Sequence, residues 1–190
     1  MNLILLCAGA STRMGFPKGL LMWEGKPLLL HQIESFLALG MKNEIVLVLG
    51  YHHERYRECL SGKFLPQVKI VMNPQPERGQ FSSLQVGVNA LEEKSWSFLL
   101  PVDCPSPKRE VWSSLWQARD ELKSAVIPTV SEKAGHPLLL GKKLLTKIFS
   151  SPADERLDSL LKMCPMNEKK YVAVEDTGIH ANINTLPCGN

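Results

Sequence analysis

The sequence predicts an α/β fold: a single-domain, Rossmann-like, three-layer α/β/α sandwich built on a mostly parallel sheet. Short apolar strands alternate with amphipathic helices, which favours right-handed crossovers and helices on both faces of the sheet. No Ser/Gly/Pro-rich linker, low-complexity run or internal repeat divides the 190 residues. We therefore expect one domain over residues 1–190, long enough to bury a hydrophobic core.

The first predicted strand and the first predicted helix illustrate the apolar patterns from which all the other elements are predicted. Leu3–Cys7 is an unbroken apolar run, as expected of a strand covered on both faces. Pro27–Leu39 has apolar residues such as Leu29 and Ile33 at helical spacing, and Gly40 ends the predicted helix. The same patterns predict, in chain order, strand Glu44–Leu49, helix His52–Leu60, strand Val68–Met72, helix Gln80–Leu91, strand Trp96–Leu100, helix Lys108–Leu122, strand Ser124–Val130, strand Pro137–Leu140, helix Leu144–Phe149, helix Arg156–Met163 and strand Lys170–Val174.

Composition excludes several classes of protein. No apolar run approaches the roughly 20 residues of a membrane span, and a net charge of +3 is too small to indicate nucleic-acid binding. The apolar run after Met1 is too short for a secretory signal and has no basic residues before it. Five cysteines without a C-x-x-C pair favour neither a zinc ribbon nor a redox motif. Unpaired thiols fit a reducing compartment, so we expect a cytoplasmic protein.

Ligands of such sheets bind at the carboxyl ends of the strands, near a reversal in strand order. The loop after the first strand reads "CAGASTRMGFPKGLL". Its small residues let backbone N–H groups approach an anion: Gly9, Ala10, Ser11 and Gly15. Arg13 adds a planar fork for phosphate, and Lys18 adds a mobile positive charge. The spacing matches neither a Walker A loop nor G-x-G-x-x-G, so the loop predicts a polyphosphate site of another type.

The loop after the third strand reads "NPQPERGQFSSLQVGV" and runs into a helix. Gly79 allows the turn into that helix, and Ser82 and Ser83 fall in its first turn. Hydroxyls and unpaired N–H groups at a helix start serve either as a cap or as ligand contacts. Both interpretations stay open from the residues alone.

The loop after the fourth strand, "PVDCPSP", carries one carboxylate, Asp103, at the carboxyl edge of the sheet. A lone Asp at this position is either a helix cap, a role that Ser106 could fill instead, or an oxygen ligand for Mg²⁺. Cys104 beside it has no matched base, which favours a packing role over that of a nucleophile.

Residues 5–21 carry the pattern L-x-A-G-x-S-x-R-M-G-x-x-K-x-L-L, which resembles the nucleotide-binding loop of single-domain nucleotidyltransferases. Within that group it is similar to the molybdenum-cofactor branch, the molybdopterin cytidylyltransferases and guanylyltransferases. The resemblance implies a fold of the nucleotide-diphospho-sugar transferase (GT-A-like) type. It implies catalytic roles for Arg13, Lys18 and Asp103. The nucleotide-binding residues that it implies are Leu6, Ala8, Gly9, Ala10, Ser11, Arg13, Met14, Gly15, Lys18, Asn73, Gly79, Ser82 and Ser83.

Two later motifs extend the resemblance. "GHPLLL" is similar to a G-H-P segment of the cytidylyltransferase branch and implies that His136 lines the acceptor side; a surface turn is the alternative. "HANINTLP" matches a segment usually written D-x-D-T-P in cytidylyltransferases and resembles N-x-N-T-P of the guanylyltransferases more closely. Amide oxygens also bind Mg²⁺. The implied metal ligands are therefore Asp103 and Asn184, with Asn182 as a further candidate.

The resemblance implies Mg²⁺-dependent transfer of a cytidylyl group from CTP to molybdopterin, with release of pyrophosphate. Ala8 favours CTP, whereas Asn182 and Asn184 favour the GTP-using branch. A sugar or polyol phosphate as acceptor, and a non-catalytic carrier of nucleotide or pterin, are the alternatives, because fold and loop do not determine the acceptor. The implied partners are a nucleoside triphosphate, a molybdopterin-type phosphate acceptor and a molybdoenzyme or its chaperone, with neither nucleic acid nor membrane.

Overall fold

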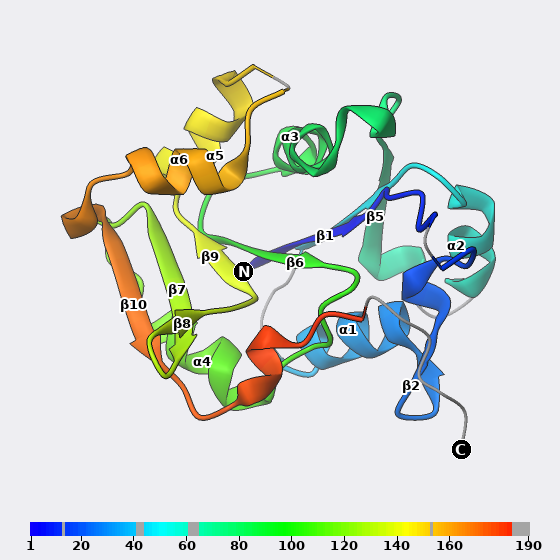
Figure 1. Ribbon diagram of the computed structural model, residues 1–190, viewed down its shortest axis with the longest axis horizontal. Helices are drawn as coiled ribbons and strands as arrows, with labels where there is room; N and C mark the ends of the chain where they lie inside the picture. The colour runs from blue at the N-terminus through cyan, green and yellow to red at the C-terminus, as the bar shows by residue number, and fades with distance from the viewer. Residues whose placement is uncertain (13, 41–43, 61–64, 153, 184–190) are drawn as a thin grey trace.

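The computed structural model describes residues 1–12, 14–40, 44–60, 65–152 and 154–183, in which a mixed sheet lies between two layers of helices (Figure 1). This arrangement confirms the predicted α/β/α sandwich. The sheet has eight strands, in the order β10-β7-β9-β6-β1-β4-β5, with β8 paired to β7 alone. Their bounds are β1 Asn2–Cys7, β4 Glu44–Leu49, β5 Val68–Met72, β6 Ser97–Pro101, β7 Ala125–Val130, β8 Lys133–Ala134, β9 Leu138–Leu140 and β10 Lys169–Ala173.

The sheet is mostly parallel, as predicted, because β5, β4, β1 and β6 run in one direction and β10 is parallel to β7. Strand β9 runs antiparallel between β6 and β7. It follows β7 through a short hairpin rather than through a helical crossover, which allows the reversal of direction.

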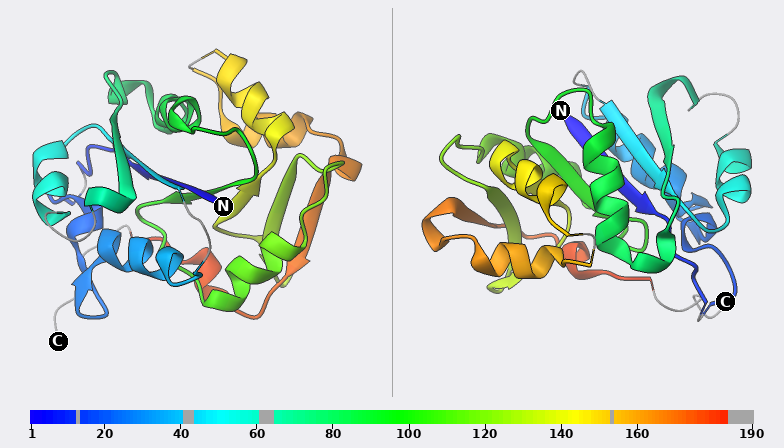
Figure 2. Two further views of the ribbon diagram at one scale, coloured as in Figure 1. Left: turned by 180° about the vertical axis from the view of Figure 1, so that it is seen from behind. Right: turned by 90° about the horizontal axis from the view of Figure 1, so that it is seen from above.

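Helices cover both faces of the sheet (Figure 2). One face carries α1 (Leu28–Leu37), α2 (His53–Cys59) and α4 (Arg109–Gln117), and the other carries α3 (Gln80–Ala90), α5 (Lys142–Ser150) and α6 (Leu157–Met163). Alternate residues of β1 pack against the helices on opposite faces of the sheet. Leu3 and Leu5 pack with α1 and α4, whereas Ile4 and Leu6 pack with α3 and α5. The unbroken apolar run at the N-terminus is therefore explained by burial on both sides of the sheet.

Two helices end two or more residues earlier than the sequence pattern predicts. Helix α1 ends at Leu37, before Gly40, and α4 ends at Gln117 rather than Leu122. After α4, the Asp120 carboxylate accepts a hydrogen bond from the backbone N–H of Leu122 at 2.9 Å. Such a local bond gives the backbone an alternative to a further helical turn, which accounts for the shorter α4.

Several short elements were not expected from the sequence. A hairpin of β2 and β3 turns at Glu24 and Gly25, which both have positive φ, as two-residue hairpin turns require. The bounds of the hairpin strands and of the short 3-10 helices are β2 Met22–Trp23, β3 Lys26–Pro27, η1 Lys18–Leu20, η2 Leu65–Gln67, η3 Pro76–Arg78, η4 Met166–Glu168 and η5 Thr177–His180.

The strand order reverses beside β1, the feature that positions the site. From β1 the chain proceeds to β4 and β5 on one side, and it then returns to place β6 on the other side. Loops that leave neighbouring strands in opposite directions open a crevice at the carboxyl edge. Every helix in the described part of the chain is too short or too polar to cross a membrane.

Candidate nucleotide-binding site

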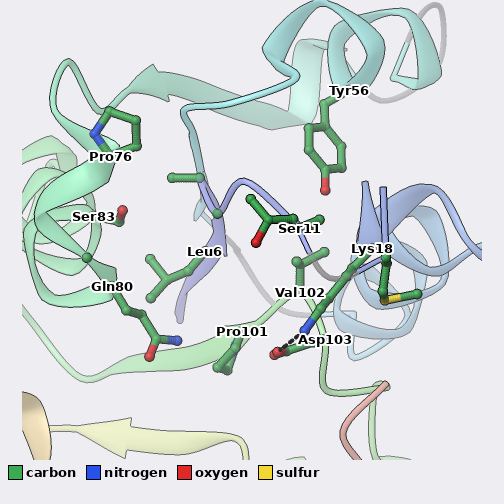
Figure 3. Close-up of a pocket in the computed structure, with 15 residues that line it drawn as sticks. Leu6, Ser11, Lys18, Tyr56, Pro76, Gln80, Ser83, Pro101, Val102 and Asp103 are labelled. Atoms are coloured by element: carbon green, nitrogen blue, oxygen red, sulfur yellow. Dashed lines mark hydrogen bonds and ion pairs between the residues drawn. The ribbon is translucent and has the colours of Figure 1, made fainter. Parts of the chain in front are cut away.

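The loops after β1, β5 and β6 converge on one pocket of about 370 Å³ at the reversal in strand order (Figure 3). The sequence analysis identified nine of the lining residues: Leu6, Ala8, Gly9, Ser11, Met14, Lys18, Gly79, Ser83 and Asp103. It did not identify the other six, which are Thr12, Tyr56, Pro76, Gln80, Pro101 and Val102. The three loops selected for their unusual composition thus meet in space.

The loop after β1 forms a tight turn around one carbonyl group. The carbonyl oxygen of Ser11 accepts hydrogen bonds from the N–H groups of Met14 at 3.0 Å and Gly15 at 3.1 Å. Ala10 and Gly15 are not among the residues that line the pocket. Arg13 lies outside the described residues. The turn leaves Gly9 and Ser11 at the pocket, where backbone groups suit an anion.

Lys18 and Asp103 form an ion pair at one side of the pocket. The Nζ atom of Lys18 lies 3.0 Å from Oδ2 of Asp103, and the two side chains are 18% and 24% exposed. Lys18 comes from η1, after the first loop, whereas Asp103 follows β6. Because both groups are shielded from most of the solvent, their interaction is stronger than that of an exposed pair. Figure 3 shows the pair closing one side of the pocket.

Tyr56 and Gly19 hold the Lys18 turn in place. The backbone N–H of Gly19 donates to the hydroxyl oxygen of Tyr56 at 3.3 Å. A Cβ atom at position 19 would lie 2.6 Å from Cγ2 of Val102 and 2.8 Å from Cε1 of Tyr56. Only glycine allows this close approach. The Tyr56 ring therefore supports the backbone beside Lys18.

The Tyr56 phenol keeps its proton. Its side chain is buried, and burial raises the pKa of Tyr56 well above the ordinary value. Its oxygen already accepts the N–H of Gly19, so the O–H can still donate to an oxygen of a bound ligand. Figure 3 shows the ring pointing from α2 into the pocket.

Asn73, which directly follows β5, holds the first turn of α3 in place. Its Nδ2 donates to the hydroxyl oxygens of Ser82 and Ser83, both at 2.9 Å, and its Oδ1 accepts the N–H of Gln75. The Ser82 hydroxyl also donates to the carbonyl of Gly79 at 2.8 Å. Asn73 and Ser82 are buried and do not line the pocket, whereas Gly79 and Ser83 do. Asn73 and Ser82 thus hold in place two residues that line the pocket.

His136 lines a second cavity of about 710 Å³ that adjoins the first. The two cavities share Leu6, Gly79, Gln80 and Pro101. Burial lowers the pKa of His136, although the Asp103 carboxylate acts in the opposite direction. The imidazole is therefore neutral near pH 7 and can accept or donate a hydrogen bond.

The C-terminal motif packs against the Asp103 loop. The backbone N–H of Ile183 donates to the Asp103 carbonyl at 2.8 Å, which brings Asn182 to the same edge of the sheet. The segment is anchored upstream, where the Asp176 carboxylate accepts the N–H of Lys108 at 2.7 Å. Asn182 is exposed, and Asn184 lies outside the described residues.

Asp103 can supply one ligand to a divalent cation. Among the described residues, no group of three or more His, Cys, Asp or Glu side chains is placed to hold a metal ion. Mg²⁺ is nevertheless bound in many enzymes by one or two carboxylates together with phosphate and water oxygens. A pocket with a single partly exposed carboxylate beside a polyphosphate loop fits that donor set.

Cys104 is not a nucleophile or a metal ligand in this structure. Burial, helped by the neighbouring Asp103 carboxylate, raises the pKa of Cys104 to about 12. The thiolate is the reactive and ligating form of cysteine, so a protonated thiol packs instead.

Comparison with known proteins gives consistent matches over nearly the whole chain. Residues 3–171 match the family described as the MobA-like NTP transferase domain. The molybdenum cofactor cytidylyltransferase of Escherichia coli (strain K12) is 28% identical over 97% of this chain and 91% of its own length. A probable molybdenum cofactor guanylyltransferase of Bacillus cereus (strain Q1) is 25% identical over 96% of this chain and 90% of its own length.

Among solved structures, Rv0371c from Mycobacterium tuberculosis H37Rv superposes with a TM-score of 0.80 at 18% identity. The alignment covers 97% of this chain and 92% of that one. A structure of Rv0371c in complex with manganese superposes with a TM-score of 0.73 at 17% identity, over 91% of this chain and 87% of that one. With the family match, these superpositions confirm the predicted GT-A-like nucleotidyltransferase fold.

Proposed function

Because the chain belongs to the MobA-like NTP transferase domain family and is thus a nucleotidyltransferase, we propose that it transfers the cytidylyl group of CTP to a phosphate of molybdopterin. Pyrophosphate is the other product. The observation that carries the proposal is the Lys18–Asp103 pair, which lies beside the polyphosphate loop at the reversal in strand order. A cation and a carboxylate at this edge of the sheet support a triphosphate-binding role for the pocket.

The proposed reaction is an in-line displacement at phosphorus. An oxygen of the acceptor phosphate attacks the α-phosphorus of CTP, and the bond from that phosphorus to the β-phosphate oxygen breaks. Such a reaction needs positioning and neutralisation of charge rather than a covalent intermediate. Lys18 stabilises the charge that develops on the phosphoryl oxygens. Arg13 and the loop N–H groups hold the β- and γ-phosphates as they leave.

The Tyr56 hydroxyl has a supporting role in this scheme. Held by the N–H of Gly19, it fixes the turn that carries Lys18 and keeps a proton to donate to a phosphate oxygen. Ser83, positioned by Asn73, supplies a further hydroxyl at the opposite wall of the pocket.

We propose Mg²⁺ as the divalent metal. Asp103 would hold it, with Asn184 and Asn182 as further oxygen ligands. When bound, Mg²⁺ would neutralise charge on the triphosphate and on the acceptor oxygen. The oxygen donors support this choice, since carboxylate and amide oxygens suit a hard cation.

The second cavity supports an acceptor larger than a simple phosphate. It joins the nucleotide pocket through four shared residues, and its wall combines apolar side chains with Gln80 and His136. The wall also carries charged residues of both signs: Arg78, Arg156, Asp154, Glu155 and Asp158. A ring system that carries a phosphate would bury its rings against the apolar wall and present its phosphate toward Lys18. Molybdopterin has this chemistry.

GTP is the second candidate nucleotide. Ala8, which lines the pocket, and the higher identity of the cytidylyltransferase relative support CTP. Asn182 and Asn184, which resemble the guanylyltransferase motif, support GTP. Pyrophosphate release with Mg²⁺ and molybdopterin, compared for CTP, GTP, ATP and UTP, separates the two. Release with CTP alone is expected. No release with any nucleotide, while nucleotide still binds, would favour the carrier or a different acceptor.

The setting of the reaction is also a proposal. We place it in the cytoplasm, since the four described cysteines are free thiols, and expect residues 1–190 to act as one catalytic domain. A molybdoenzyme or its chaperone is the proposed recipient of the product.

A further inference from the structure

A separate cavity of about 360 Å³ lies between α1 and the start of α4. It is lined in part by His31 from α1 and by Ser106 and Trp112 from the segment that follows Asp103. It shares none of its lining residues with the nucleotide pocket.

This cavity gathers polar atoms that lack partners. In the described part of the chain, four buried side-chain nitrogen or oxygen atoms have no hydrogen-bond partner. Three of them belong to residues of this cavity: Nδ1 of His31, Oγ of Ser106 and Nε1 of Trp112. Trp112 is only 1% exposed. Buried polar groups are normally paired, so these three groups have hydrogen-bonding capacity left for bound water or for a ligand.

Positive charge surrounds the same cavity. Lys108 and Arg109, both exposed, lie at the start of α4 and line the cavity. Arg109 uses one N–H to donate to the carbonyl of Ala38 at 2.9 Å, and a guanidinium has further donors. Glu24 is the one acidic residue in the lining, and it lies 3.1 Å from Nε2 of His31. The lining therefore combines two cations with one carboxylate that already has a partner. A second carboxylate lies at the start of α4, where Asp176 accepts the backbone N–H of Lys108 at 2.7 Å and leaves the side-chain cations available.

The donor set identifies the chemistry of the ligand. An indole N–H, an ammonium and a guanidinium only donate hydrogen bonds, so the ligand must offer several acceptor oxygens. The Ser106 hydroxyl and the His31 imidazole can donate or accept. A phosphate group satisfies both requirements, because it has several acceptor oxygens and, as hydrogen phosphate, one O–H donor.

We propose that this cavity is a second anion site that binds a phosphate group, distinct from the nucleotide pocket. The phosphate would lie at the start of α4, between Arg109 and Lys108, with Trp112 and Ser106 donating from within. Ser106 follows Asp103 by three residues, so occupancy of the site would order the segment that leads away from the nucleotide pocket. The proposal does not depend on which nucleotide or acceptor the enzyme uses.

The test follows the indole N–H resonance of Trp112 in ¹⁵N-labelled protein during titration with inorganic phosphate, at constant ionic strength maintained with chloride. We expect a saturable shift of that resonance. Replacing both cations, Lys108→Gln with Arg109→Gln, should weaken binding by roughly tenfold or more, as expected for the loss of charge-assisted hydrogen bonds. A parallel titration with glycerol 3-phosphate distinguishes free phosphate from a phosphate ester, according to which binds more tightly.

The matched control is Lys142→Gln, which removes an exposed lysine from the first residue of α5, a helix of the same length as α4. It should leave the titration unchanged. A Trp112 resonance that does not move with either phosphate compound, or that moves equally in the double variant, overturns the proposal. Ser106→Ala, a small change at the segment after Asp103, provides a second variant. It should also weaken binding, and unchanged affinity in it would count against the site.

Discussion

Lys18 and Asp103 lie 85 residues apart in the sequence, yet their side chains meet at 3.0 Å at one side of the candidate nucleotide pocket. One comes from the turn after β1 and the other from the end of β6, the two strands that flank the reversal in strand order. The pair therefore links the predicted phosphate loop to the predicted metal ligand, and four of the following predictions test the residues that form or support this site.

Replacing Lys18 by alanine should lower kcat by about 100-fold or more, because a positioned charge that stabilises the transition state is lost. KM for the nucleotide should change less. Steady-state pyrophosphate release with the preferred nucleotide measures both constants. Lys69→Ala, which removes a lysine from β5, serves as the control. Turnover like that of the wild type in Lys18→Ala would remove Lys18 from the catalytic machinery.

Asp103→Asn keeps the shape of the side chain and removes its charge. We expect loss of metal-dependent turnover, because an amide oxygen attracts a divalent cation less strongly than a carboxylate does. The measurement is the activity of Asp103→Asn as a function of Mg²⁺ concentration. The surface variant Asp120→Asn, measured in the same way, is the control. If Asp103→Asn kept the activity and the metal dependence of the wild type, Asp103 would not be a ligand.

Tyr56→Phe removes the hydroxyl that accepts the N–H of Gly19 and leaves the buried ring in place. The expected loss in kcat is about three- to tenfold, which corresponds to the usual free-energy contribution of one hydrogen bond. Tyr171→Phe, at an exposed tyrosine of β10, should have no effect. A purely structural role would lower the midpoint of thermal unfolding without changing kcat below that temperature, and this pattern would refute the positioning role.

Asn73→Ala should destabilise the protein by about 1–3 kcal/mol, because two buried hydroxyls lose the amide that pairs them. KM for the nucleotide should rise as well, since Ser83 lines the pocket. Urea unfolding and initial rates give the two quantities. Asn89→Ala, an exposed change in α3, the helix that carries Ser82 and Ser83, is the control. Unchanged stability would show that the Asn73 contacts contribute little.

The partly buried His136 predicts a pH dependence of stability. Burial lowers its pKa in the folded state from the ordinary 6.5, so the folded protein resists protonation more than the unfolded chain. The free energy of unfolding should therefore decrease as the pH falls below about 6.5, and His136→Gln should show a smaller decrease. Urea unfolding from pH 8 to pH 5 measures both. Equal slopes in the two proteins would contradict the assignment.

The sequence predicted much of the fold because its strands are buried on both faces and read as apolar runs. The reversal in strand order could also be anticipated, since three loops with unusual composition follow strands that meet at one edge. The shorter α4 could not be anticipated, because its end depends on a local hydrogen bond of Asp120. The antiparallel direction of β9 depends on a short hairpin that the apolar pattern does not reveal.

Pocket-lining residues could be identified from the sequence where charge or glycine spacing distinguished them from core residues. Gly9, Lys18 and Asp103 were identified in this way. Tyr56 was missed, because a tyrosine in an amphipathic helix is indistinguishable from a core residue until the turn at Gly19 is placed beside it. Asn73 was identified by resemblance, but its role in holding two serines depends on a contact between β5 and α3 that the sequence does not specify.

The most direct test of the central claim follows the label from [α-³²P]CTP in the presence of Mg²⁺ and molybdopterin. The account predicts that the label moves to molybdopterin, with one pyrophosphate released for each label transferred, and that Lys18→Ala slows both together. Label that stays in CTP or its hydrolysis product, while [α-³²P]GTP labels molybdopterin, would contradict the assignment of the nucleotide. Label that reaches molybdopterin from neither nucleotide would contradict the proposed transfer itself.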